Sequence, residues 1–165
     1  MEALTTGKRA PEITLPVMDG DYFSLAYALG RGPAVLVFFK ISCPVCQFAL
    51  PYFERIYQAA KGKNATIVGI SQNSKKETAF FAQQYGISYP IALENTHTFA
   101  ISNAYGITNV PTVFYVNQDG VIEVSAVGWS RADVEEIARR LSEETKLPPI
   151  TVIKPSEDVP AFRAG

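Results

Sequence analysis

Two apolar runs separated by one helix-length segment constrain the fold of this 165-residue chain more than any other feature. The runs are Ala-Val-Leu-Val-Phe-Phe at 34–39 and Ala-Thr-Ile-Val-Gly-Ile-Ser at 65–71. Runs with so few polar residues are typical of strands buried on both faces of a parallel or mixed sheet. Between them, apolar residues recur every three or four positions from Cys46 to Ala60, which predicts an amphipathic helix ended by Lys61-Gly62. The pattern is that of a strand–helix–strand unit.

Turn signals predict two hairpins outside this unit. Each has Asp-Gly in its turn, and Asp-Gly between apolar runs is a strong hairpin signal. The turns are at residues 18–21 and 117–120, and the predicted strands cover residues 13–17, 22–25, 112–116 and 121–127.

Capping residues predict the remaining helices. Ser74, with Glu77 three positions later, has the spacing of a capping box and starts a helix that ends at Gly86. The other helical segments are a turn at 27–29 before Gly30, a helix from a Thr96 cap through Tyr105, and a last helix that starts at Ser130 or Asp133 and stops before Pro148-Pro149.

A chain of this length suits one domain. We expect an α/β fold with a central mixed sheet, helices on both faces and an N-terminal β-hairpin. The domain is expected to cover residues 1–147, with a mobile lead-in over residues 1–10. Residues 148–165 contain four prolines and show no periodicity, which predicts a proline-rich C-terminal tail that either follows the surface or is disordered.

Composition excludes several classes of partner. The net charge is −1, with 15 basic and 16 acidic residues, so no strong field attracts nucleic acid or a membrane. The longest apolar runs are far shorter than the roughly 18 residues of a membrane span. Residues 1–11 lack the apolar core of a secretory signal, so we expect a cytoplasmic protein. A trimmed export signal leaves the same pattern, and a periplasmic location therefore stays open.

The only two cysteines, Cys43 and Cys46, lie three positions apart where the first buried strand meets the helix. Three interpretations compete: two small buried residues, half of a zinc site, or a redox dithiol. Zinc needs three or four protein ligands, and the chain offers one histidine, His97, beside this pair. We therefore expect no metal and no other cofactor.

Local geometry favours the redox interpretation. Pro44 suits the first helical position and so places Cys43 at the N-cap, where free N–H groups and the positive end of the helix dipole favour a thiolate. Lys40 adds positive charge if it turns toward this sulfur. Cys46 lies one turn on, within reach for a disulfide and on the apolar face. One exposed, activated sulfur with a shielded partner suits thiol–disulfide exchange.

Motifs along residues 8–142 resemble the thioredoxin superfamily. The strand–Cys-x-x-Cys–helix arrangement carries the first likeness. The opening of the chain, residues 10–16 with Asp19-Gly20 and residues 23–25, resembles the redoxin branch, which includes TlpA/ResA-type thiol-disulfide oxidoreductases and the AhpC/TSA-related peroxiredoxins. Residues 105–112, Tyr-Gly-Ile-Thr-Asn-Val-Pro-Thr, resemble that branch's cis-proline segment, and Asp119-Gly120 and Gly128 also fit.

The resemblance implies a role for each matched residue. Cys43 would be the attacking cysteine and Cys46 the resolving one. Val110 and Pro111 would form the cis-proline loop, whose backbone can pair with an extended substrate segment. A trans Pro111 opening an edge strand is the alternative.

Three positions depart from the family's pattern. Val37 stands where many thioredoxins have a buried aspartate, and Ala49 stands where TlpA-type proteins often have an acidic residue. Ser42 replaces the usual tryptophan, and the sole tryptophan is Trp129. Proton transfer near Cys46 must therefore use another group or water, or proceed slowly.

The function predicted is thiol–disulfide oxidoreductase, with a protein disulfide or dithiol as substrate, a second redox protein as electron donor or acceptor, and a monomeric state. A peroxiredoxin-like thiol peroxidase is one alternative, although Cys43 occupies the position of the peroxiredoxin threonine and Phe39 that of its proline. The other alternative is a non-catalytic, redox-sensing binding module that docks through the tail.

Overall fold

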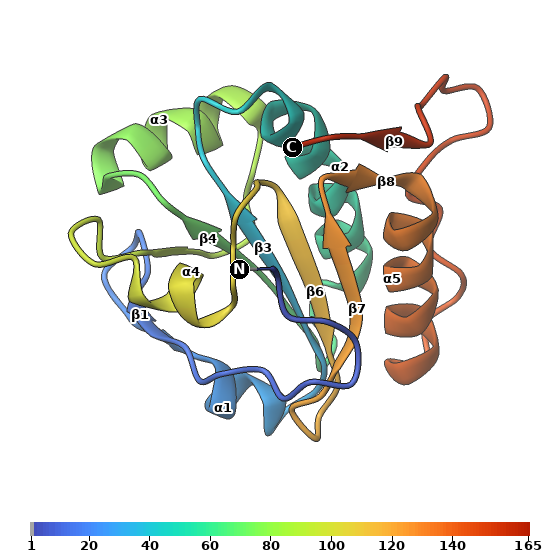
Figure 1. Cartoon of the computed structure of the whole chain (residues 1–165). Coiled ribbons are helices and arrows are strands. Elements are labelled where there is room, and N and C mark those ends of the chain that lie inside the picture. The colour runs from blue at the N-terminus through green and yellow to red at the C-terminus, as the bar shows by residue number, and fades with distance from the viewer. Residues whose placement is uncertain (1) are drawn as a thin grey trace.

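A mixed five-stranded sheet forms the centre of the molecule in the computed structural model, which describes residues 2–165 (Figure 1). Its strand order is β5-β4-β3-β6-β7, with β3, β4 and β5 parallel and β6 and β7 antiparallel to their neighbours. The strands are β3 (Ala34–Phe39), β4 (Thr66–Ser71), β5 (Ile91–Leu93), β6 (Thr112–Val116) and β7 (Ile122–Val127). The predicted class, a thioredoxin-like mixed sheet, is confirmed.

Within residues 2–165, five helices surround this sheet. They are α1 (Leu25–Leu29), α2 (Pro44–Ala60), α3 (Lys75–Tyr85), α4 (Ala100–Ala104) and α5 (Arg131–Glu144). The N-terminal hairpin is also present, as β1 (Thr14–Pro16) paired antiparallel with β2 (Tyr22–Ser24).

Strand β3 separates two apolar cores because its side chains alternate between the faces of the sheet. Val35, Val37 and Phe39 belong to the core that α2, α3 and α5 cover. The intervening residues, including Leu36 and Phe38, belong to the core beneath the N-terminal hairpin and α1. All six β3 residues are buried, so the strand carries the continuous apolar pattern that predicted it.

The helix caps predicted from the sequence at Ser74 and Ser130 are confirmed. The Ser74 side chain accepts from the Glu77 N–H, Glu77 accepts from the Ser74 N–H, and Gly86 ends α3 with a φ of 68°. Of the two predicted starts for the last helix, Ser130 is the cap, because its hydroxyl accepts from the Asp133 N–H at 3.3 Å.

Helix α4 corrects one prediction. It begins at Ala100 rather than near Thr96, and its N-cap, Phe99, has a φ of 49° and makes no side-chain capping bond. The buried Glu94 carboxylate accepts from the N–H groups of Ile101 and Ser102 instead. A residue outside the helix supplies the cap, so the helix start cannot be seen in its own sequence.

The predicted mobile lead-in over residues 1–10 is a second correction, because residues 7–10 are hydrogen-bonded along the sheet. Residue 1 of that prediction lies outside the described residues. Gly7 N–H donates to the Ile122 carbonyl at 2.8 Å, and Ile122 N–H donates to the Lys8 carbonyl at 2.9 Å. Ala10 N–H donates to the Gly120 carbonyl at 2.8 Å. Backbone groups of β7 are thereby satisfied.

Residues 148–165 lie against the domain. Val152, Ile153 and Val159 are buried in the core that α2 and α5 share. Arg55 of α2 donates to both carboxylate oxygens of Glu157, at 2.6 and 2.9 Å, and to the Val152 carbonyl at 2.8 Å. Further on, β9 (Phe162–Arg163) pairs antiparallel with β8 (Trp129–Ser130), a two-residue ladder that the sequence pattern did not predict.

No helix within residues 2–165 is long and apolar enough to cross a membrane.

The Arg55–Glu157 pair predicts a pH dependence of stability. The Arg55 hydrogen bonds lower the pKa of Glu157 from 4.5 to about 2. A carboxyl with a lowered folded-state pKa stabilises the fold above pH 4.5, and this contribution is lost as pH falls toward 2. Glu157→Gln should therefore lower the Tm most at pH 5 and above, and the gap to the parent should close as pH falls. Thermal unfolding between pH 7 and 2 measures this.

The exposed neighbour Asp158 provides the matched control. Asp158→Asn should leave the Tm close to the parent value throughout. A Tm gap for Glu157→Gln that stays constant with pH would contradict the assignment.

Candidate active site at the start of helix α2

The two cysteines lie at the end of the sheet where β3 leads into α2. Residues 40–42 connect Phe39 to Cys43, the N-cap of α2, which has extended backbone angles (φ −86°, ψ 116°). Pro44 occupies the first turn, and Gln47 N–H donates to the Cys43 carbonyl at 3.0 Å to begin the helix. The sequence prediction of a cysteine N-cap followed by proline is confirmed.

The Cys43 sulfur lies between two backbone groups. Cys46 N–H donates to Sγ at 3.2 Å, and the Cys43 thiol donates to the Val110 carbonyl at 3.3 Å. Cys43 is half-buried, so part of the residue is exposed to solvent. The sulfur thus lies at the N-terminus of α2, facing a main-chain N–H of its first turn.

Cys46 is fully buried beneath it. Burial raises the pKa of the Cys46 thiol, and a hydrogen bond with the Cys43 side chain raises it further. Both cysteines are free thiols. The pair therefore has one half-buried cysteine and, a turn away, one fully buried cysteine whose raised pKa keeps it protonated.

Pro111 lies beside the pair, and the Val110–Pro111 bond is cis, as the resemblance implies. The loop is fixed on both sides. Thr112 Oγ1 donates to the Asn109 carbonyl at 2.7 Å, and Gly128 N–H donates to the Pro111 carbonyl at 2.7 Å. These bonds hold the Val110 carbonyl against Cys43.

The positions that depart from the family pattern lie next to the cysteines. Val37 and Ala49 are buried with Cys46 in one apolar core, so neither position supplies a carboxylate there. Lys40 is exposed, and a hydrogen bond with its backbone and, to a smaller extent, its positive charge lower the pKa of Cys46 against the larger effect of burial.

Two residues that sequence reasoning missed hold the loop before Cys43. Asn73 Oδ1 accepts from Ile41 N–H at 3.0 Å, and Gln47 Nε2 donates to the Ile41 carbonyl at 3.0 Å. Asn73 closely follows β4, the parallel neighbour of β3. Because parallel strands end at the same edge of a sheet, its position after the second apolar run was a usable signal.

Trp129 is a third missed residue. It is buried, and its ring lies 5.0 Å from that of Phe48 and 5.1 Å from that of Tyr52, both on α2. Its indole N–H donates to the Pro160 carbonyl at 2.8 Å. Ser42, directly before Cys43, is not aromatic, but Trp129 and the aromatic residues of α2 form a cluster on the helix that Cys43 caps.

His97 is exposed in the loop before α4. Residues 2–165 contain no group of three or more histidine, cysteine, aspartate or glutamate side chains placed to hold a metal ion.

The sheet order, the cysteine N-cap and the cis-proline loop together define a protein of thioredoxin-like fold. The model of the AhpC/TSA family matches residues 6–125, and the chain belongs to that family.

Curated relatives are thiol-disulfide oxidoreductases named ResA. The protein from Halalkalibacterium halodurans is 28% identical over 140 residues, which cover 84% of this chain and 78% of that protein. The protein from Bacillus subtilis is 26% identical over 122 residues, covering 73% of this chain and 66% of that protein.

Solved structures of the same fold include two kinds of redox protein. A thiol:disulfide interchange protein from Chlorobium tepidum has a TM-score of 0.69 at 26% identity, over 84% of this chain and 99% of that one. The peroxidoxin BcpB from Mycobacterium tuberculosis has a TM-score of 0.69 at 20% identity, over 87% of this chain and 97% of that one.

The two thiols should differ in reactivity. Iodoacetamide at pH 7.5 is expected to alkylate Cys43 and leave Cys46 unmodified, because Cys46 is buried and its pKa is raised. Cys43→Ser should slow alkylation of the folded protein by about ten-fold or more, whereas Cys46→Ser should keep the fast reaction. Peptide mass spectrometry locates the label. Equal labelling of both cysteines in the folded protein would contradict the geometry.

Proposed function

We propose that this protein is a thiol–disulfide oxidoreductase that exchanges disulfides with protein substrates through the Cys43-Pro44-Val45-Cys46 dithiol. The observation that carries the proposal is the position of half-buried Cys43 at the start of α2, with its sulfur 3.2 Å from the Cys46 N–H. The ResA relatives support the reaction class.

Exchange would begin at Cys43. Its thiolate attacks one sulfur of a substrate disulfide, the substrate S–S bond breaks, and a substrate thiolate leaves while a mixed disulfide forms at Cys43. The helix N-terminus favours the attacking thiolate, and Pro44 starts the helix without leaving a backbone N–H unsatisfied.

Cys46 would complete the reaction. Its thiol loses a proton and attacks Cys43 Sγ, so that the mixed disulfide breaks, the second substrate thiolate leaves and the Cys43–Cys46 disulfide forms. Two electrons pass to the substrate, and the reverse sequence oxidises a substrate dithiol. Burial opposes loss of the Cys46 proton, and the Lys40 charge favours it. We assign Lys40 a supporting electrostatic role on this basis.

Val110 and Pro111 would position the substrate. Their backbone lies beside the attacking sulfur, and the Val110 carbonyl is within 3.3 Å of it. An extended substrate segment paired with this loop brings its disulfide to Cys43, which favours protein substrates over small disulfides.

Replacing the resolving thiol should trap the intermediate. Cys46→Ser mixed with a disulfide-containing protein is expected to accumulate a covalent mixed disulfide, because no second thiol is present to release it. Non-reducing electrophoresis and mass spectrometry detect the adduct at Cys43. Cys43→Ser is the matched control and should form none. Failure of Cys46→Ser to form an adduct, with full exchange activity retained, would remove these roles.

A thiol peroxidase is the second candidate, favoured by the family match and the peroxidoxin structure. In the peroxiredoxin frame Cys43 stands at the threonine position and Phe39, buried in β3, at the proline position. We therefore expect peroxide consumption with dithiothreitol as reductant to be slow. A measured rate of hydrogen peroxide consumption that exceeds the rate of protein disulfide exchange would favour the peroxidase instead.

A further inference from the structure

The last residues of the chain lie beside the cysteine site. Figure 1 shows this segment crossing from β9 to the first turn of α2. The crossing begins where β9 pairs with β8, with Trp129 opposite Arg163 and Ser130 opposite Phe162. One residue earlier, Arg131 N–H donates to the Ala161 carbonyl at 3.0 Å. The segment is thus held in extended form by main-chain bonds.

Gly165 brings this segment to the atom that contacts the reactive sulfur. A Cβ added at Gly165 would collide with the Val110 carbonyl oxygen and lie 2.8 Å from its carbon. That same oxygen accepts from the Cys43 thiol at 3.3 Å. Asn109 Nδ2 donates to the Gly165 carbonyl at 3.3 Å. Residues 161–165 therefore occupy the surface on which an extended substrate segment would lie.

Gly128 lets residues 161–165 approach the backbone closely, because it has no side chain. Its φ is 79°, and an added Cβ would lie 2.6 Å from the Arg163 carbonyl oxygen. Its N–H donates to the Pro111 carbonyl at 2.7 Å. One glycine thus fixes the proline loop and also lets the segment approach the backbone closely.

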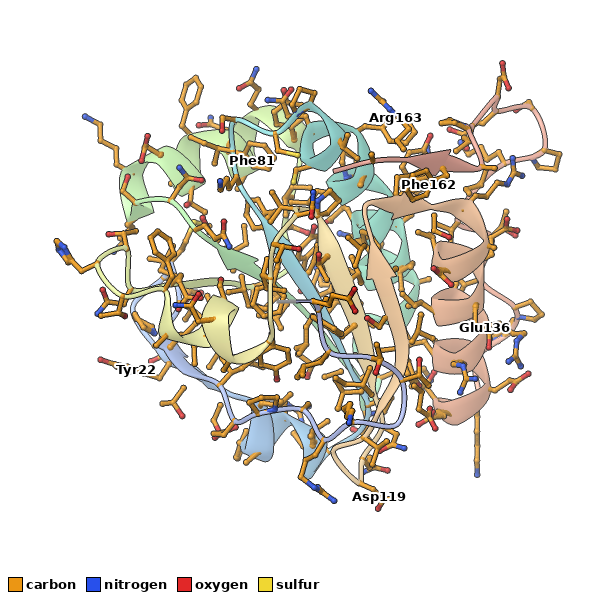
Figure 2. The ribbon with its side chains drawn as sticks, viewed as in Figure 1. Tyr22, Phe81, Asp119, Glu136, Phe162 and Arg163 are labelled. Carbon is orange, nitrogen blue, oxygen red and sulfur yellow. The ribbon has the colours of Figure 1, made fainter. Side chains whose placement is uncertain are left out.

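Residues 161–165 are held more weakly than residues 152–159, which precede them. Every residue from 161 to 165 is exposed, whereas Val159 is buried and Glu157 is paired with Arg55. Arg163 places its guanidinium 5.2 Å from the centre of the Phe48 ring, and its side chain and that of Phe162 leave β9 in different directions (Figure 2). A two-residue ladder with exposed side chains is a segment that opens locally at low cost.

We propose that residues 161–165 are an internal competitor for the substrate surface, which must leave β8 and the Val110 carbonyl before a protein disulfide can reach Cys43. This proposal rests on the proposed function. It assigns the segment the role of an extended pseudosubstrate that is anchored through residues 152–159.

The test compares the parent with a variant ending at Pro160, in single-turnover reactions of the reduced proteins. Insulin serves as the protein disulfide and 5,5′-dithiobis(2-nitrobenzoate) as the small one. The shortened variant should reduce insulin faster by about five-fold or more, because the rate follows the fraction of molecules with the surface open. Its reaction with the small disulfide should change by less than about two-fold, since that reagent needs no extended surface.

If the shortened chain does not fold, two full-length variants of Arg163 still test the proposal, one that reverses its charge and one that keeps it. Arg163→Glu places a negative charge over the Phe48 ring, and Arg163→Lys keeps the cation. Insulin reduction should rise by about two-fold or more in Arg163→Glu only, the size expected for loss of an exposed cation–π contact.

The outcomes separate the two proposals. Unchanged or slower insulin reduction in the shortened variant and in Arg163→Glu, with the small disulfide still reacting, overturns the competitor role. If the parent and the variants leave both disulfides unreduced, the proposed function itself fails.

Discussion

Two backbone groups fix the position of the Cys43 sulfur: the Cys46 N–H at 3.2 Å on one side and the Val110 carbonyl at 3.3 Å on the other. The sheet brings the Cys43 sulfur and the Val110 carbonyl together across 67 residues of sequence. Strand β3 pairs antiparallel with β6, with Phe38 opposite Thr112, so the end of β3 meets the start of β6. The helix start and the proline loop must then meet at this edge, and the chemistry of the site follows from the strand pairing.

Much of this arrangement could be predicted because its signals are local. An unbroken apolar run specified β3, and the capping box at Ser74 and Glu77 specified the start of α3. Proline after Cys43 placed the sulfur at the N-cap. The parts that sequence reasoning missed depend on distant residues: Glu94 caps α4 from outside it, and Asn73 holds the loop at Ile41. Three-residue β5 and two-residue β8 and β9 are too short to show a period.

The absence of a carboxylate at Val37 and Ala49 gives the shielded sulfur an apolar environment. Burial then raises the pKa of the Cys46 thiol and keeps it protonated, and a hydrogen bond with the Lys40 backbone and the Lys40 charge oppose this effect. Under the proposed function, Cys43 would attack the substrate disulfide, and Cys46, whose pKa is raised by burial, would resolve the mixed disulfide. The segment at Gly165 adds control of access to the same carbonyl oxygen.

The reduction potential of the Cys43–Cys46 couple tests the central claim most directly. The protein is equilibrated in glutathione or dithiothreitol buffers of defined ratio, and the oxidised fraction is measured by thiol labelling and mass spectrometry. A working exchange dithiol predicts one reversible two-electron transition between about −270 and −120 mV. A potential below about −300 mV, typical of a structural disulfide, or no disulfide between the two cysteines at any ratio, would contradict the account.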